Sequence, residues 1–178
     1  AMFCLVLLST GCTAHQTAAP ALQVSYIQYG GQQCPRLLLE SGEDAALSTV
    51  NTEIEAQFQK LAAQLSTDGR ISTFVSSSAT TISVLLRVEE PVSYGTDGEV
   101  WGICYDYGKK EIVPCGAYLT AQGYSYADLC GDIERKLHEM GTYEYIDILP
   151  YYCFDADAAP VLIVAAVEHP AGADSWKH

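Results

Sequence analysis

Basic residues are scarce in this chain of 178 residues, which has 9 Lys and Arg against 22 Asp and Glu and a formal net charge of −13. A surface this acidic repels phosphate backbones and anionic lipid headgroups, which argues against a nucleic-acid-binding role. The same charge either attracts cationic partners or simply keeps the protein soluble. Because 49% of the residues are hydrophobic and only 17% are charged, wholesale disorder is excluded, and the length suits one ordinary domain.

Motifs for catalysis and metal binding are also lacking. No Cys-x-x-Cys or His-Glu-x-x-His occurs, no Gly-rich phosphate loop is present, and the four histidines are scattered along the chain. Residues 123–127 have the outline of a nucleophile elbow, but Ser125 is better explained as the N-cap of a following helix. The sequence therefore predicts a protein that is not an enzyme and uses no metal or cofactor.

The first twelve residues indicate a place in the cell envelope. Residues 2–8 form an apolar run that is too short to span a bilayer, which needs about 20 residues, and that is typical of a signal peptide. The Leu-Ser-Thr-Gly-Cys ending resembles a bacterial lipobox, in which cleavage before Cys12 leaves a thiol for lipid attachment. We predict a signal peptide over 1–11 that lacks its basic n-region, a lipidated tether over 12–21 and one domain over 22–178. The protein would be anchored by lipid on the outer face of a bacterial membrane, or secreted if the run is an ordinary secretory signal.

Five cysteines follow the predicted lipidation site, and an odd number cannot pair completely. Outside the cytosol one or two disulfides could form among them, whereas in an anaerobic host all five could stay reduced and buried as small apolar residues. The sequence leaves both alternatives open. The cysteines are Cys34, Cys104, Cys115, Cys130 and Cys153.

Apolar periodicity predicts an α+β fold. Capping signals at Ser41 and Ser125 each precede a stripe of apolar residues at helical spacing. The stripes are Leu47, Val50, Ile54, Phe58, Leu61 and Leu65 in the first helix and Leu129, Ile133, Leu137 and Met140 in the second. Extended segments are predicted over 22–27, 34–40, 71–77, 82–88, 100–105, 111–113, 151–154 and 161–167. Short turns between successive strands favour an antiparallel β-sheet with two main helices packed on one face.

Aromatic residues are the remaining positive signal. Twelve tyrosines and two tryptophans fall mostly outside the helix stripes and are interleaved with acidic residues. Tyr and Trp combine rigid apolar area with a polar tip, which is the usual composition of a protein-binding surface, but the same residues also line buried sheet faces. If most tyrosines are buried, a purely structural envelope lipoprotein becomes the better interpretation.

Four segments in order carry a resemblance to a known family. They are Val50-Asn51-Thr52-Glu53-Ile54, Ser93-Tyr94-Gly95, the hairpin from Gly102 to Ile112, and Tyr151 to Asp155 followed by Val161 to Val164. Together they resemble the extracytoplasmic domains of RsiV-type anti-sigma factors, which sense lysozyme; similar domains stand alone in lipoproteins or precede polysaccharide deacetylases. Where that family often has Gly-Gly-Ala-His, this chain has Thr96-Asp97-Gly98-Glu99. The resemblance implies the fold and an outward-facing binding role.

Charge and resemblance together predict a non-enzymatic, lipid-anchored cell-envelope domain that binds or senses a protein or wall ligand. A basic protein such as lysozyme is the sharpest candidate, because the negative charge would steer it to the surface. The predicted contact loop consists of Tyr94, Asp97, Glu99 and Trp101. The alternative is a substrate-positioning module for a cell-wall-modifying enzyme such as a peptidoglycan deacetylase.

Overall fold

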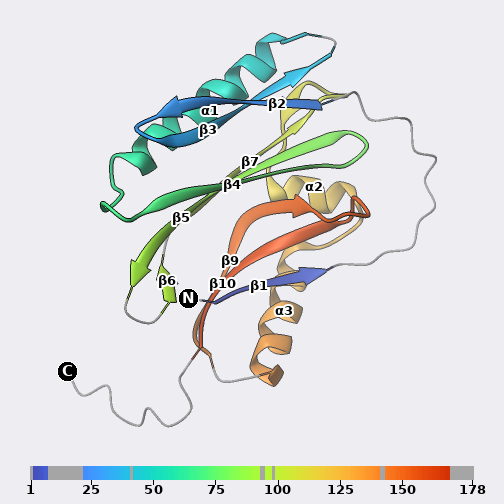
Figure 1. Ribbon diagram of the computed structural model, residues 1–178. Helices are drawn as coiled ribbons and strands as arrows, with labels where there is room; N and C mark the ends of the chain where they lie inside the picture. The colour runs from blue at the N-terminus through green and yellow to red at the C-terminus, as the bar shows by residue number, and fades with distance from the viewer. Residues whose placement is uncertain are drawn as a thin grey trace.

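A computed structural model describes residues 2–7, 22–40, 42–92, 95–97, 99–140 and 143–168, and Figure 1 shows the arrangement of their strands and helices. The elements are β1 (Met2–Leu7), β2 (Leu22–Tyr29), β3 (Gln32–Leu39), α1 (Ala45–Ala62), β4 (Arg70–Ser77), β5 (Thr81–Val92), β6 (Gly95–Asp97), β7 (Val100–Asp106), β8 (Glu111–Ile112), α2 (Cys115–Ala121), α3 (Tyr126–Met140), β9 (Tyr143–Phe154) and β10 (Pro160–Glu168). The predicted α+β class is confirmed.

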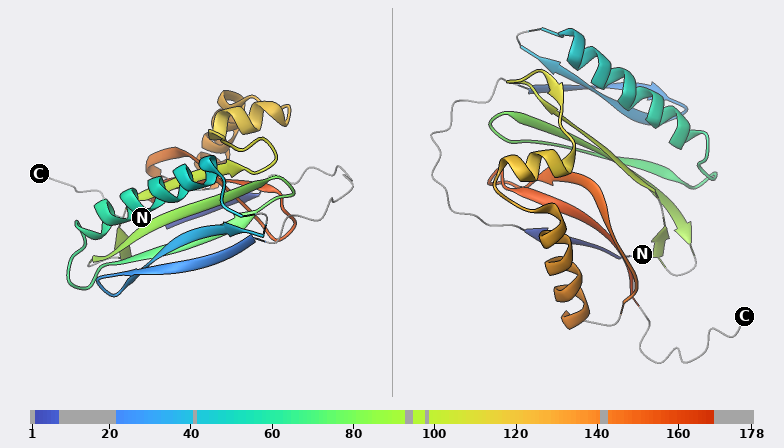
Figure 2. Two further views of the ribbon diagram at one scale, coloured as in Figure 1. Left: turned by 90° about the horizontal axis from the view of Figure 1, so that it is seen from above. Right: turned by 180° about the vertical axis from the view of Figure 1, so that it is seen from behind.

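The strands form three sheets, and every pairing between them is antiparallel. The central sheet has the order β4-β5-β7-β8, with β6 paired to the far end of β5. A hairpin of β2 and β3 forms the second sheet, and the third has the order β1-β10-β9. Seen from behind in Figure 2, α1 lies in front of the central sheet and the β2–β3 hairpin, while α2 and α3 lie in front of β9 and β10.

Helix α1 covers the first of two hydrophobic cores. Five of the six predicted stripe residues are buried in it, but α1 ends at Ala62, so Leu65 lies beyond the helix. The helix begins three residues later than the Ser41 signal indicates, because the Asp44 carboxylate accepts a hydrogen bond from the Leu47 amide at 2.9 Å and caps the first turn. The first core consists of Cys34, Leu37, Leu47, Val50, Ile54, Phe58, Leu61, Ile71, Ile82, Val84, Leu86, Ile103 and Tyr105.

The second core lies between β9, β10 and the two shorter helices. Ser125 caps α3 as predicted, since its hydroxyl accepts from the Asp128 amide at 3.3 Å. Helix α2 was not predicted, because seven residues are too few to show helical periodicity. Cys104 of β7 faces this core, whereas its neighbours Ile103 and Tyr105 face the first one, as the alternation of a strand requires. The second core consists of Cys104, Cys115, Leu119, Ile133, Leu137, Tyr152, Phe154, Leu162 and Val164.

Two strands are longer than predicted, and each continues through a proline. Strand β5 was expected to end before Pro91, but it continues there and pairs with β6. Pro91 lies beyond the residues of β5 that pair with β4 and β7, so its missing amide does not interrupt either of those two ladders. Strand β9 begins at Tyr143 and passes Pro150 in a bulge, since its register against β10 shifts between Ile148 and Tyr152.

The described part of the predicted signal segment forms a strand. Met2–Leu7 form β1 at the outer edge of the third sheet, paired only with β10 among the described residues. The tether with Cys12 lies outside the described residues, so cleavage and lipidation stay predictions. Among the helices that the structure describes, none is long and apolar enough to cross a membrane.

Two buried tyrosines should respond in opposite ways to loss of the hydroxyl group. Tyr152 is fully buried; within the part of the chain that the structure describes, its hydroxyl has no nitrogen or oxygen partner and interacts with the Cys104 thiol, which is a weak hydrogen-bonding group. Tyr152→Phe should therefore raise the free energy of unfolding by about 1 kcal/mol in urea titrations. The equally buried Tyr105 donates to both carboxylate oxygens of Asp44, at 3.1 and 3.2 Å, so Tyr105→Phe should lower it by about 1.5 kcal/mol. A loss of stability in Tyr152→Phe would contradict the structure.

Candidate functional site

The predicted contact loop lies where β5, β6 and β7 meet. Asp97 is the last residue of β6 and pairs with Glu90 of β5, while Glu99 precedes β7 and its carbonyl accepts from the Val88 amide at 2.9 Å. Glu99 is exposed. Tyr94 of the predicted loop and the lipidation residue Cys12 both lie outside the described residues.

Trp101 contributes more to the core than to the surface. It is half-buried in β7, pairs with Leu86 of β5 and packs against the first core. A different aromatic side chain accompanies Glu99, namely Tyr151 of β9, whose pKa is raised by burial and by the negative charge of Glu99. The sequence contained Tyr151 among many tyrosines but offered no signal that β9 would bring it to this loop.

Strand pairing adds two carboxylates that the sequence analysis did not assign to the site. Glu90 of β5 pairs with Asp97 of β6, and the preceding residue, Glu89, pairs with Arg70 of β4. Glu89, Glu90, Asp97 and Glu99 are called the acidic hairpin below. The prediction that β5 ends before Pro91 left no place for the pairing of Glu90 with Asp97.

Hydrogen bonds keep the two glutamates of β5 ionised and in place. Burial alone would raise the pKa of Glu89, but hydrogen bonds from Ser72 at 2.8 Å and from Arg70 at 2.5 Å outweigh burial and lower it. The hydroxyl of Ser66 and its amide, at 2.9 Å, donate to Glu90 and lower its pKa as well. These bonds anchor the base of the acidic hairpin to β4 and to the segment after α1.

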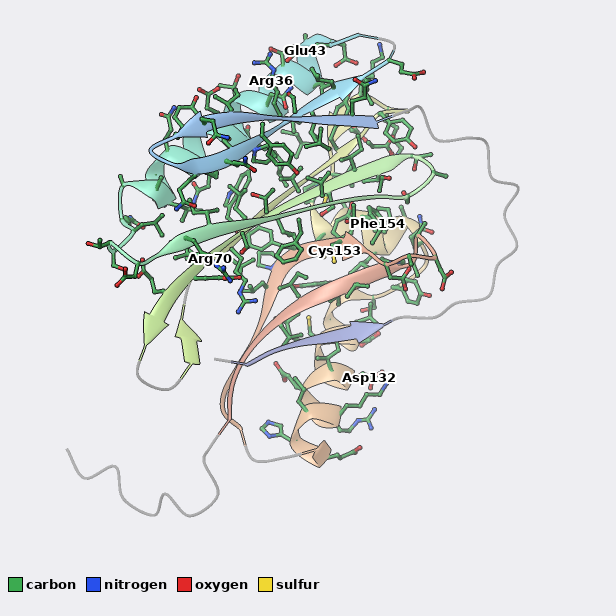
Figure 3. All side chains as sticks on the ribbon, in the orientation of Figure 1. Arg36, Glu43, Arg70, Asp132, Cys153 and Phe154 are labelled. Carbon is green, nitrogen blue, oxygen red and sulfur yellow. The ribbon has the colours of Figure 1, made fainter. Side chains whose placement is uncertain are left out.

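Most described basic side chains are already paired within the molecule. Ion pairs hold Arg36, Arg70, Lys109, Lys110 and Arg135. Figure 3 places the Arg36–Glu43 pair and Asp132, the partner of Arg135, at opposite ends of the view. Several exposed carboxylates have no ion pair to a basic side chain of the described ranges: Glu40, Glu53, Asp68, Glu99, Asp128, Glu134 and Asp157. The negative charge is therefore directed to solvent rather than neutralised internally.

The tyrosines with described side chains belong mainly to the two cores. Tyr105 and Tyr152 are fully buried, and Tyr118 stacks on Tyr152 with ring centroids 4.5 Å apart. Partly buried tyrosines pack on the cores at positions 29, 107, 118, 124 and 126. Only Tyr26 of this described group is exposed, at 49%. The tyrosines thus favour the interpretation as sheet-face residues that pack on the cores, and a broad aromatic binding surface is not supported. By this criterion a purely structural envelope lipoprotein is favoured, and the case for a binding domain depends on the charge alone.

Burial makes most of the described thiols poor nucleophiles and poor metal ligands. The five cysteines from Cys34 to Cys153 are free, and three of them are buried. Burial raises the pKa of Cys34 and Cys104 to about 11 and that of Cys115 to about 12, so these thiols stay protonated at neutral pH. Cys153, labelled on β9 in Figure 3, also has a pKa raised by burial. Among the residues described, no group of three or more His, Cys, Asp or Glu could hold a metal ion.

Two hollows on the described surface are large enough for a small ligand. The larger, of about 520 Å³, lies between the β7–β8 hairpin and α2 and is lined in part by Lys109, Ile112 and Tyr118. Its buried carboxylate, Asp106, accepts from the amides of Gly108 and Lys109, both at 2.9 Å, and so stabilises the hairpin turn. The other hollow, of about 450 Å³, lies between the β2–β3 turn and the end of α1. In the larger hollow the Lys109 ammonium lies 4.0 Å from the Asp106 carboxylate and 3.8 Å from that of Glu111, so these charges pair with one another.

Comparison with known proteins does not assign a family. No protein-family model matches this chain, and no curated protein gives a significant match to its sequence. Among the described residues, the acidic hairpin is the site that the geometry supports best, because Glu99 is exposed and Glu90 is fixed by hydrogen bonds from Ser66.

Proposed function

We propose that this protein is a non-enzymatic binding or sensor domain of the bacterial cell envelope, anchored by a lipid on Cys12, whose ligand is a basic protein. The observation that carries the proposal is the outward negative charge: several exposed carboxylates have no ion pair to a described basic side chain, while most described basic side chains are paired with acids. Such a field accelerates encounter with a cationic protein and orients it.

The acidic hairpin is the proposed contact surface. Glu90 is held by hydrogen bonds from the amide and the hydroxyl of Ser66, so its carboxylate loses little side-chain entropy when a ligand binds. Glu89 is already ion-paired with Arg70 and its side chain is only 12% exposed, so it supports this surface rather than contacting the ligand. Lysozyme is the ligand to test first, because it is a basic protein and because the sequence resembles lysozyme-sensing domains.

Charge reversal at the contact surface tests the proposal. The double variant Asp97→Lys and Glu99→Lys should weaken lysozyme binding at least tenfold, equivalent to about 1.4 kcal/mol, and should flatten its salt dependence. Calorimetric titration of the whole protein at low and moderate salt measures both quantities.

A matched control separates the site from net charge. Asp128→Lys and Glu134→Lys on α3 make the same change in charge at two exposed positions away from β5–β7, and should weaken binding only about two- to threefold. A second basic protein of similar charge serves as the ligand control. Equal losses in both double variants, or equal weak binding of both basic proteins that disappears with salt, would refute a specific site at the acidic hairpin.

A further inference from the structure

Strand β10 has one edge that only β1 occupies. In the third sheet β10 is central, with β9 along one side and β1 along the other. The β1 pairing runs without a break over six residues, from Met2 opposite Ala166 to Leu7 opposite Val161. Among the described residues no other strand lies beside that edge of β10. In Figure 1, β1 lies at the outside of the sheet, so its removal would leave β10 as the new edge.

The residues at this edge of β10 are apolar and uncharged, which favours pairing with a neighbouring strand. Residues 161–166 of β10 read Val-Leu-Ile-Val-Ala-Ala, and β1 reads Met-Phe-Cys-Leu-Val-Leu, with no charge, proline or glycine in either segment. Exposed edge strands in natural proteins are usually protected by charged residues, prolines or bulges that prevent pairing with another chain. The β1-facing part of β10 has none of these devices, although the bulge of the β9–β10 ladder lies on the other side.

The acceptor edge is rigidly supported. Val161, Leu162 and Val164 are fully buried and Ile163 is 7% exposed, and Leu162 and Val164 belong to the second core. The other side of β10 is held by β9. These exposures include the cover given by β1, but β9 and the second core hold β10 independently of β1. An incoming strand would therefore have to order little of its partner's backbone.

We propose that the β10 edge is a strand-acceptor site, which takes an extended, uncharged, apolar segment of a partner protein in antiparallel orientation once β1 has been cleaved away. The inference rests on the proposed lipoprotein function, since cleavage before Cys12 would detach β1 from the chain. The occupant chemistry is argued from β1 itself, an apolar hexapeptide in an unbroken antiparallel register. Main-chain hydrogen bonds provide the affinity of such strand addition.

The remaining tether does not have the chemistry of β1. Residues 12–21 read Cys-Thr-Ala-His-Gln-Thr-Ala-Ala-Pro-Ala, which is small and polar and includes a proline that lacks a ladder donor. A segment from another protein is therefore the better occupant of the edge after cleavage.

The test compares the processed and unprocessed forms of the whole protein. The mature form is isolated from membranes of a bacterium that processes lipoproteins, and the Cys12→Ala chain, which cannot be processed as a lipoprotein, retains β1. The probe is a fluorescent peptide of residues 2–7 with Cys4→Ser and a neutral polyethylene-glycol tail. Its anisotropy should report binding to the mature form that is at least tenfold tighter than binding to the Cys12→Ala form in the same detergent.

A control peptide and a second variant keep the result interpretable. The same peptide with alternate backbone nitrogens methylated retains its side chains but loses ladder donors, and should bind at least tenfold more weakly. Mass spectrometry of the mature form shows whether β1 has been removed. If β1 is still present, the lipoprotein proposal fails. The acceptor site is then tested with the double variant Leu5→Pro and Val6→Pro of the full chain, which displaces β1 from β10 without cleavage. One of two adjacent strand residues points its amide toward β10, so this variant removes at least one ladder donor.

Three results would overturn the acceptor site itself. The first is failure of the peptide to bind either the cleaved form or the double-proline variant while circular dichroism shows both folded. The second is equal binding of the methylated peptide, which would indicate apolar adsorption. The third is a mature protein that dimerises and is not dissociated by the peptide, which would make a second copy of this chain the occupant.

Discussion

Replacing Asn51 with alanine should lower the free energy of unfolding by about 3 kcal/mol. Asn51 is the buried polar residue of α1. Its Oδ1 accepts a hydrogen bond from the Leu37 amide of β3 at 2.9 Å, and its Nδ2 donates one to the Leu37 carbonyl at 3.0 Å. The side chain thus makes the two backbone hydrogen bonds that a neighbouring strand would otherwise make with Leu37. Alanine leaves both backbone groups buried without partners, and each such group costs about 1–3 kcal/mol.

The same side chain joins a third group to the helix. Nδ2 of Asn51 also donates to the Glu43 carboxylate at 3.1 Å, and this bond is the largest cause that lowers the pKa of Glu43, followed by the bond from Arg36. Asn51 thus connects α1, β3 and the turn between them.

Thr52→Ala provides the matched control for Asn51→Ala. Thr52 is the next residue of α1, but it is exposed, and its hydroxyl donates within the helix to the Ser48 carbonyl at 2.9 Å. Its replacement should change the free energy of unfolding by less than about 0.5 kcal/mol. Urea titration followed by circular dichroism measures both variants. An Asn51→Ala protein within 1 kcal/mol of the wild type would show that these bonds do not hold α1 to β3.

Replacing Gly102 with valine should cost about 2–3 kcal/mol, although valine favours strands elsewhere. A Cβ atom built at Gly102 would lie 2.5 Å from Cδ2 of Leu85, 3.0 Å from Cγ of Tyr151 and 3.1 Å from its Cβ. The Leu85 methyl group could rotate away, but the Tyr151 atoms lie next to the β9 backbone and cannot yield without moving that strand. Since Tyr151 lies in the electrostatic range of Glu99, the variant should also disturb the acidic hairpin.

The control for Gly102→Val is a glycine with free space around it. Gly131 is exposed in the interior of α3, and no atom lies within 4 Å of a Cβ built there, so Gly131→Ala should stabilise the protein by about 0.5–1 kcal/mol. Thermal unfolding of the two variants should shift in opposite directions. A Gly102→Val protein as stable as the wild type would mean that β9 does not pack over β7 as described.

Local patterns were sufficient for much of the fold. The stripe from Leu47 to Leu61 is buried because helical periodicity places those residues on one face whatever lies opposite. The hairpin around Gly108 was predicted because turn residues between two short strands act locally. Boundaries were less reliable: Asp44 rather than Ser41 caps α1, and β5 and β9 pass through their prolines because the strand edges there leave room for them.

The sequence by itself determined the α+β class, the two main helices, most strands and the acidic balance, since these follow from composition and from periodicity over a few residues. Tertiary structure alone decided which side chains meet. It placed Trp101 against a core rather than on a ligand surface and packed most described tyrosines in or against the two cores. It also set Tyr151 near Glu99, paired Asp97 with Glu90 and laid β1 on β10. Contacts between residues far apart in the chain depend on how whole strands and helices pack, and no local pattern encodes that choice.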